Sequence, residues 1–169
     1  RPTVREALAA LLAEGLVDRI PHRGTVVRAL DEESIEDLTR ARFVVESAGV
    51  RAWETASDGE RSGVRLALEG FRSLPADASA ARTTEAHLAI HRSIVALAGS
   101  ERVLAAADLM YAELRLALAT VDRQRRDHAD QVLSHCQLVD LLEAGDTDAT
   151  LEELGRHLDN GRRSLLATI

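Results

Sequence analysis

The residues of this chain that are best suited to chemistry are histidines, which occur at positions 22, 87, 91, 128, 135 and 157. His87 and His91 are four residues apart on a predicted helix, so both rings lie on one face and can clamp a metal ion. His135 and His157 each lie in a helical pattern beside leucines. Because facing helices of a bundle often assemble metal sites, we predict that these four histidines bind one metal ion. The alternative is that each is a hydrogen-bonded core residue.

The other two histidines, His22 and His128, lie in a turn and beside charged residues, and we expect both to face solvent. Glu85 is close to His87 in sequence, so one alternative function is a metal-dependent hydrolase with Glu85 as general base. The sequence contains no recognisable glycine-rich phosphate loop, nucleophile elbow or cysteine–histidine pair. We therefore do not expect an enzyme.

The elements that must position these histidines are long helices, because helical periodicity dominates the chain after Asp31 and no strand pattern occurs there. Ser57 and Glu60 have capping-box spacing, and Gly99 and Gly145 interrupt the pattern. The predicted helices span residues 32–56, 59–72, 82–98, 101–124, 128–144 and 147–167. Short connections between them favour an all-α, antiparallel bundle of six to seven helices.

The first 30 residues have a different pattern. A helix is predicted over 3–15, with Thr3 and Glu6 at capping-box spacing and Gly15 at its end. Two short β-type runs, 16–20 and 25–28, flank the turn 21–24, which indicates a hairpin. Residues 1–29 carry five arginines and three acidic residues, whereas the whole 169-residue chain has a net charge of −7. The acidity therefore belongs to the helical part, and nucleic-acid contact is expected only at the N-terminal part.

Composition excludes other classes of protein. The single cysteine, Cys136, cannot form an internal disulfide, which fits a reducing, cytoplasmic location. No apolar run approaches the ~20 residues of a membrane span, and the N-terminus lacks a signal-peptide pattern, so we expect no membrane association. A length of 169 residues predicts one domain or slightly more.

Arg1, Thr3 and Arg5 lie at the start of the first predicted helix, where recognition helices contact base edges. Arginine can donate to guanine O6 and N7, and threonine can contact a phosphate or a thymine methyl. From spacing alone, an ordinary amphipathic helix with solvated arginines is the alternative.

The order of residues in this region adds a family resemblance. Arg-Pro-Thr-Val-Arg-Glu-Ala-Leu, then Glu-Gly-Leu-Val and Pro-His-Arg-Gly-Thr, resembles the recognition helix and wing of GntR-type winged helix-turn-helix regulators over residues 1–27. The resemblance implies that Arg1, Thr3 and Arg5 enter the major groove of operator DNA, while Arg23 and Gly24 of the wing approach the minor groove or backbone. The family domain starts upstream with further helices, so we expect this chain alone to bind DNA poorly. A homodimer is expected because such proteins read two half-sites.

Residues 32–169 resemble the FCD ligand-binding domain of the FadR-like branch of that family. The similarity lies in His87-Leu-Ala-Ile-His91-Arg, in the segments around His135 and His157, and in Arg42-Phe-Val-Val-Glu46. The family usually has aspartate where this chain has His87. Replacing a hard anionic oxygen by a fourth imidazole favours Zn²⁺ or Ni²⁺ over Mn²⁺.

In the resembled domain the metal helps to hold a small carboxylate or hydroxy-acid effector, and an arginine beside it provides a second anchor. We assign that role to Arg42, with Arg115 and Asn160 as weaker candidates; the alternative for Arg42 is an ion pair with Glu46. The sequence thus predicts a ligand-responsive, DNA-binding transcription regulator, with a partial winged helix at 1–30 and an effector- and metal-binding domain at 31–169. A plain dimerisation module with structural histidines, like the hydrolase, is an alternative.

Overall fold

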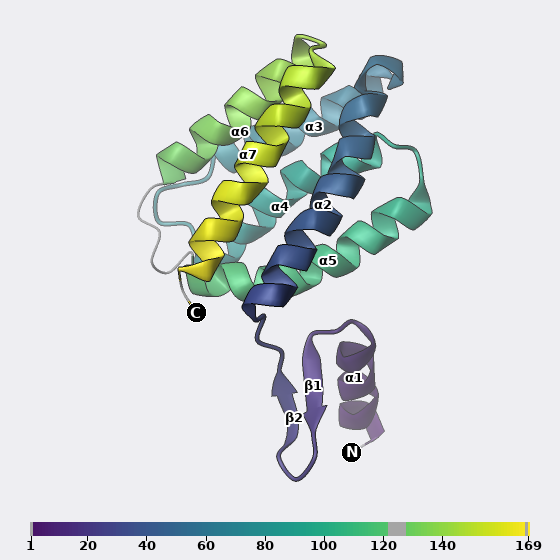
Figure 1. Ribbon diagram of the computed structural model, residues 1–169, viewed down its shortest axis with the longest axis vertical. Coiled ribbons are helices and arrows are strands. Elements are labelled where there is room, and N and C mark those ends of the chain that lie inside the picture. The colour runs from purple at the N-terminus through teal and green to yellow at the C-terminus, as the bar shows by residue number, and fades with distance from the viewer. Residues whose placement is uncertain (1, 122–127, 168) are drawn as a thin grey trace.

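The computed structural model describes residues 2–121, 128–167 and 169, which form a helical bundle with a small helix-and-hairpin unit at one end (Figure 1). The N-terminal unit consists of α1 (Pro2–Ala13), β1 (Val17–Ile20) and β2 (Gly24–Val27). The bundle consists of α2 (Glu32–Ala52), the 3₁₀ turn η1 (Trp53–Thr55), α3 (Asp58–Arg72), α4 (Ala80–Ala96), α5 (Glu101–Val121), α6 (His128–Glu143) and α7 (Thr147–Leu166). The predicted fold class is confirmed.

The hairpin is close to its predicted position. β1 and β2 pair antiparallel, from Val17 opposite Val27 to Ile20 opposite Gly24. α1 begins at Pro2, so Thr3 lies inside the first turn and the predicted capping box with Glu6 is wrong. Proline is favoured at the first helical position because the backbone N–H that it lacks would have no intrahelical partner there.

The bundle helices begin at polar caps. Asp31, Ser79 and Asp146 each accept a backbone N–H in the first turn that follows, which satisfies a donor with no intrahelical partner. Ser57 and Glu60 form the predicted capping box, with both reciprocal hydrogen bonds present. α2 ends at Ala52 rather than at residue 56, because the chain tightens into η1. The expected continuation of α5 to residue 124 lies outside the described residues.

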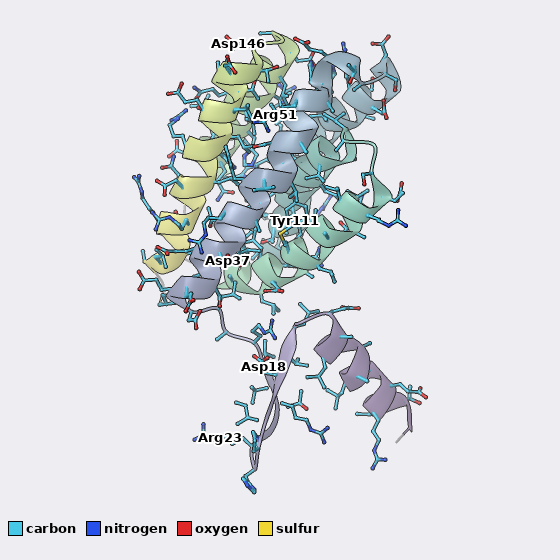
Figure 2. All side chains as sticks on the ribbon, turned by 45° about the vertical axis from the view of Figure 1, so that its right-hand side comes forward. Asp18, Arg23, Asp37, Arg51, Tyr111 and Asp146 are labelled. Atoms are coloured by element: carbon cyan, nitrogen blue, oxygen red, sulfur yellow. The ribbon has the colours of Figure 1, made fainter. Side chains whose placement is uncertain are left out.

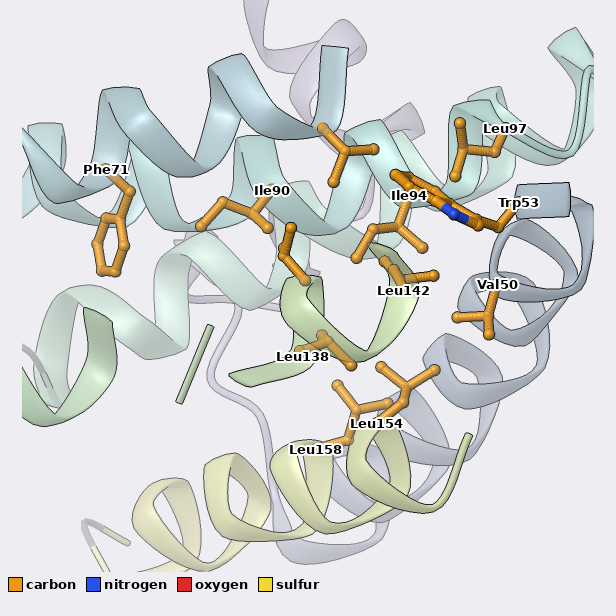
Figure 3. Close-up of a cluster of buried hydrophobic side chains, with 12 residues drawn as sticks. Val50, Trp53, Phe71, Ile90, Ile94, Leu97, Leu138, Leu142, Leu154 and Leu158 are labelled. Carbon is orange, nitrogen blue, oxygen red and sulfur yellow. The ribbon is translucent and has the colours of Figure 1, made fainter. Parts of the chain in front are cut away.

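α4 lies between α2, α3 and α5, and α7 runs antiparallel along α2 (Figure 1). The larger core cluster packs side chains of five helices around Trp53, Phe71, Ile90 and Leu138 (Figure 3). A second cluster surrounds Ile35, Leu88 and Leu114 and joins α2, α4, α5 and α7. The side of α4 that faces these clusters therefore lies inside the bundle.

Gly49 lets α2 and α4 approach each other at backbone distance. A Cβ atom at this position would lie 1.9 Å from the carbonyl oxygen of Ile94, which is far inside van der Waals contact. Glu46 precedes Gly49 by about one turn of α2, and His91 precedes Ile94 by about one turn of α4. The close crossing therefore brings the Glu46 and His91 side chains within reach of each other.

The N-terminal unit lies at the end of the bundle where α2 begins and α7 ends (Figure 1). Asp18 is at the bundle side of the hairpin, and Arg23 is close to its opposite tip (Figure 2). Within the described part of the chain, no helix combines the length and apolar character that a membrane crossing requires.

Candidate metal and effector site

Four histidines from three helices converge on one point inside the bundle. His87 and His91 come from α4, His135 from α6 and His157 from α7, and one ring nitrogen of each lies within 4.8 Å of the others. The Nε2 atom of His91 is 3.2 Å from Nε2 of His87 and 3.3 Å from Nε2 of both His135 and His157. The four predicted residues are therefore brought together by the fold.

Hydrogen bonds on Nδ1 hold three of these rings, and for two of them the partner can only accept. Nδ1 of His135 lies 2.6 Å from the carbonyl oxygen of Gln131, and Nδ1 of His91 lies 2.8 Å from Oε2 of Glu46. Because a carbonyl and a carboxylate only accept, both Nδ1 atoms carry the hydrogen. In the neutral rings the Nε2 lone pairs then face each other at 3.3 Å, and a cation between them is the arrangement that satisfies both.

Burial favours the neutral form of three of these rings. Desolvation lowers the pKa of His87, His91 and His157 well below the usual value of 6.5. Repulsion adds to this effect, because a positive charge on one ring disfavours protonation of the next and Arg42 lies close by. Neutral imidazole is the form that ligates metals, so the set is suited to a metal ion near neutral pH.

Glu46 connects the histidines to two further side chains. It is fully buried, and besides His91 it accepts hydrogen bonds from Nε of Arg42 at 3.0 Å and from the hydroxyl of Tyr111 at 3.1 Å. The Arg42 guanidinium also lies over the Tyr111 ring, 5.7 Å from its centroid. Burial, followed by the negative charge of Glu46, raises the pKa of Tyr111. Tyr111 therefore stays a neutral donor that holds the carboxylate in place.

A cavity of about 410 Å³ opens beside the cluster. Arg42, His87, His135 and His157 line it, together with apolar side chains such as Leu114 and Leu118 of α5. Nη2 of Arg42 is buried and has no hydrogen-bond partner among the described residues. A buried guanidinium N–H without an acceptor is costly, so this corner of the cavity is suited to an anionic oxygen. The ion pair of Arg42 with Glu46 is thus present, and the same side chain also lines the cavity.

The two weaker effector candidates differ in their position relative to the cavity. Asn160 is exposed on α7 but lines the cavity. Arg115 is exposed on α5 and does not belong to the described lining of the cavity. Glu85, the candidate general base, is exposed on α4, outside the buried cluster.

His128 was expected in solvent, but both of its ring nitrogens are buried and the ring meets Phe71 edge-on at 4.8 Å. The expectation for His128 is wrong because Phe71 of α3 packs over the start of α6.

Four of the five predicted DNA-contacting residues are exposed on the N-terminal unit. Thr3 and Arg5 are exposed on α1, and Arg23 and Gly24 are exposed at the hairpin turn. Arg1 lies outside the described residues. His22 in the same turn has a φ of 65°, a left-handed conformation that non-glycine residues seldom adopt.

Sequence reasoning missed Tyr111 and treated Glu46 only as a motif partner of Arg42. Tyr111 is 65 residues from Glu46, so no local spacing links them. The signal available was composition: the chain has a single tyrosine, and a tyrosine that is buried must find a hydrogen-bond partner for its hydroxyl.

Residues 37–160 match the model of the FCD domain family. The chain is also 30% identical over 157 residues to a Paenarthrobacter nicotinovorans protein named "Probable D-xylose utilization operon transcriptional repressor", covering 92% of this chain and 68% of that protein. The chain belongs to the GntR family of transcription regulators with an FCD domain. The resemblance noted in the sequence is thus confirmed, and the protein is a regulator rather than an enzyme.

Solved structures of similar proteins agree with the assignment of this chain to the GntR family. A GntR transcriptional regulator from Rhodococcus sp. RHA1 is 28% identical and superposes with a TM-score of 0.88, covering 99% of this chain and 81% of that one. A GntR family member from Pseudomonas syringae pv. tomato, 21% identical, has the same fold with a TM-score of 0.67 over 97% of this chain and 68% of that one.

Proposed function

We propose that this GntR regulator binds operator DNA through residues 1–30 and senses a small organic anion through residues 31–169, with a divalent metal as part of the sensor site. The observation that carries the proposal is the juxtaposition of four histidine Nε2 atoms with the unpaired Nη2 atom of Arg42 beside one cavity. A metal ion held by the four histidines that accepts the effector as a fifth ligand, together with a nearby arginine, would give two anchors for a carboxylate or hydroxy acid.

The donor set favours Zn²⁺ or Ni²⁺ over Mn²⁺. Neighbouring nitrogen ligands of a tetrahedral zinc ion, with Zn–N distances of about 2.0–2.1 Å, lie about 3.3–3.4 Å apart. The distances of 3.2–3.3 Å from His91 Nε2 to the other three Nε2 atoms fit that spacing. All four donors are imidazoles, which suit zinc and nickel, whereas manganese prefers oxygen ligands.

The cavity supports an effector of modest size. Its volume of about 410 Å³ lies at the lower end of the range for small-molecule sites, about 300–1,000 Å³. Arg42 and a metal ion would both hold the acidic end of such a ligand, and the leucines of α2, α5 and α7 would pack against the remainder. Asn160 is available as a further polar contact at the α7 side.

The DNA-binding part of the proposal assigns Arg1, Thr3 and Arg5 to base and phosphate contacts and Arg23 and Gly24 to the wing. The exposure of Thr3, Arg5, Arg23 and Gly24 supports it. A homodimer would present two such units to the two half-sites of an operator. Effector binding would then change DNA affinity through its different affinity for two arrangements of the dimer.

Zinc titration tests the sensor site. Wild-type protein, freed of metal by a chelator, should bind close to one Zn²⁺ per chain, and His91→Ala should lose this binding because His91 is the common neighbour of the other three rings. His22→Asn is the matched control, since His22 is exposed and asparagine tolerates its left-handed backbone. Equal zinc binding by His91→Ala and wild type would remove the metal from the proposal.

DNA binding is tested in the full-length protein, on duplexes that it selects from a randomised library, because this chain alone is expected to bind DNA poorly. Arg5→Ala should weaken binding to the selected sequence by about 5- to 150-fold, the value of one base contact, and relax sequence preference. Arg72→Ala is the control, because Arg72 is an exposed bundle arginine paired with Glu69. Indifference of binding to the Arg5 substitution would contradict the assignment of α1 as the recognition helix.

A further inference from the structure

One helix, α5, contacts both the sensor site and the N-terminal unit. Tyr111 donates its hydroxyl to Glu46, which in turn holds His91, and Leu114 lines the cavity. Glu113, on the same turns, lies 3.9 Å from Nη1 of Arg28, just after β2. Successive residues of a helix are rigidly linked, so a shift of Tyr111 or Leu114 moves Glu113 as well.

Arg28 is fixed at the point where the parts of the N-terminal unit meet. Its guanidinium donates to the Asp18 carboxylate of β1, with Nη2 at 2.9 Å and Nε at 3.2 Å from Oδ1. Its backbone N–H donates to the carbonyl of Leu16 at 3.0 Å. The pair with Asp18 lowers the pKa of that carboxyl, chiefly through the hydrogen bond. A displacement of the hairpin therefore displaces Arg28 as well.

The end of α1 packs on the same contact. Gly15, in the turn between α1 and β1, has a φ of +72°, and a Cβ there would lie 3.1 Å from Nη1 of Arg28 and 3.3 Å from Oε1 of Glu113. The Arg28 and Glu113 side chains are 34% and 30% exposed, so the pair is screened less than a surface ion pair. Among the described residues, it is the ion pair that joins the hairpin to the bundle.

We infer that the Arg28–Glu113 contact couples the state of the sensor cavity to the position of α1 and the hairpin, with α5 as the moving element. This inference rests on the proposed function and adds its route of regulation. A ligand that packs against Leu114, or a change in the Glu46–Tyr111 hydrogen bond, displaces α5 relative to α2. The contact between Glu113 and Arg28 then tightens or breaks, and the hairpin shifts. The proposed DNA-contacting residues of α1 move with the hairpin.

A double-mutant cycle measures the energetic coupling between two residues, which spatial proximity alone does not establish. Hydrogen exchange of the hairpin amides, residues 17–27, is measured by mass spectrometry in wild type, Tyr111→Phe, Glu113→Gln and the double variant. Tyr111→Phe removes the hydroxyl that donates to Glu46 and leaves the hairpin untouched. We expect it to change hairpin exchange by about two- to fivefold, the scale of one partly exposed ion pair, and to have no effect in the Glu113→Gln background.

Asp108→Asn is the matched control, because Asp108 forms an ion pair from α5 to Arg92 of α4 without contact to the hairpin. It should leave hairpin exchange unchanged. Unaltered hairpin exchange in Tyr111→Phe, or an equal change with and without Glu113, would overturn the inference. If Tyr111→Phe does not fold, Leu118→Val, a milder change in the cavity wall, replaces it with the same expected outcomes.

The cycle is independent of the zinc titration. If Tyr111→Phe has no Glu113-dependent effect on hairpin exchange while zinc binding is normal, the coupling is overturned and the sensor site stands. An intact cycle in a protein that binds no zinc supports the coupling and removes the metal from the proposed function.

Discussion

Nδ1 of His91 lies 2.8 Å from Oε2 of Glu46, and both side chains are fully buried although 45 residues separate them in sequence. The hydrogen bond determines which nitrogen of His91 carries the proton and aims its Nε2 at the other three imidazoles. Glu46 also places a carboxylate in direct contact with one of the four imidazoles. The affinity of the site should therefore depend on a residue that does not touch the metal.

Glu46→Gln tests this dependence. The substitution keeps the shape of the side chain but removes its charge, and we expect zinc affinity to fall by about 10- to 100-fold, as for other residues that orient metal ligands. Competition with a chromophoric chelator measures the affinity. Glu33→Gln, at an exposed position of the same helix, is the control and should bind zinc like wild type. Equal affinity of Glu46→Gln and wild type would show that Glu46 acts only in packing.

Gly49→Ala should damage the same hydrogen bond from a distance. The added methyl would lie 1.9 Å from the Ile94 carbonyl oxygen, so α2 and α4 must separate. We expect a loss of about 1–3 kcal/mol in the free energy of unfolding, the cost of overpacking a core, together with weaker zinc binding. Gly63→Ala on α3 is the control, because no atom lies within 4 Å of its Cβ position. That change should stabilise the protein by up to about 1 kcal/mol through helix propensity. Chemical denaturation measures both.

The positions of the four histidines and of Arg42 were predictable because each follows from helical periodicity within a single segment. The i, i+4 spacing of His87 and His91 places both rings on one face whatever the rest of the fold does. The contacts of Tyr111 with Glu46 and of Phe71 with His128 were not predictable, because each joins helices whose relative rotation depends on packing across the bundle. Gly49 shows the same limit: a glycine inside a helix has no local signature of a close helix crossing.

The metal-free protein should lose stability as the pH falls below about 6.5. Burial lowers the pKa of His87, His91 and His157 in the folded state below the value of 6.5 expected in the unfolded chain. Between those values the unfolded chain binds more protons, so unfolding becomes more favourable with decreasing pH. Above the unfolded-state pKa this contribution is constant. Thermal unfolding of chelator-treated protein across this range, with the His91→Ala variant for comparison, measures the effect, which should be smaller in the variant.

Arg42→Gln should weaken binding of the anionic effector while preserving the fold. The variant loses the charge and the buried Nη2 donor that faces the cavity. Charge-assisted hydrogen bonds contribute about 1.5–3 kcal/mol, so affinity for the tightest-binding member of a panel of small carboxylic and hydroxy acids should fall by about 10- to 150-fold. Calorimetry on the zinc-loaded protein measures this affinity. Arg51→Gln, an exposed arginine on the same helix, should behave like wild type. An unchanged affinity in Arg42→Gln would assign the anion to another part of the cavity.

His87→Asp should move the metal preference of the site toward Mn²⁺. The substitution replaces a neutral nitrogen ligand by a hard, anionic oxygen, and oxygen ligands suit manganese while imidazoles suit zinc and nickel. We expect the ratio of Zn²⁺ to Mn²⁺ affinity to fall by at least about tenfold, measured by competition between the two ions on the same protein sample. His87→Asn is the control, because it supplies an oxygen of similar reach without the charge. If His87→Asp and His87→Asn bind Mn²⁺ equally, the charge has no role in selectivity. If neither changes the ratio, His87 is not a ligand, and the site consists of His91, His135 and His157.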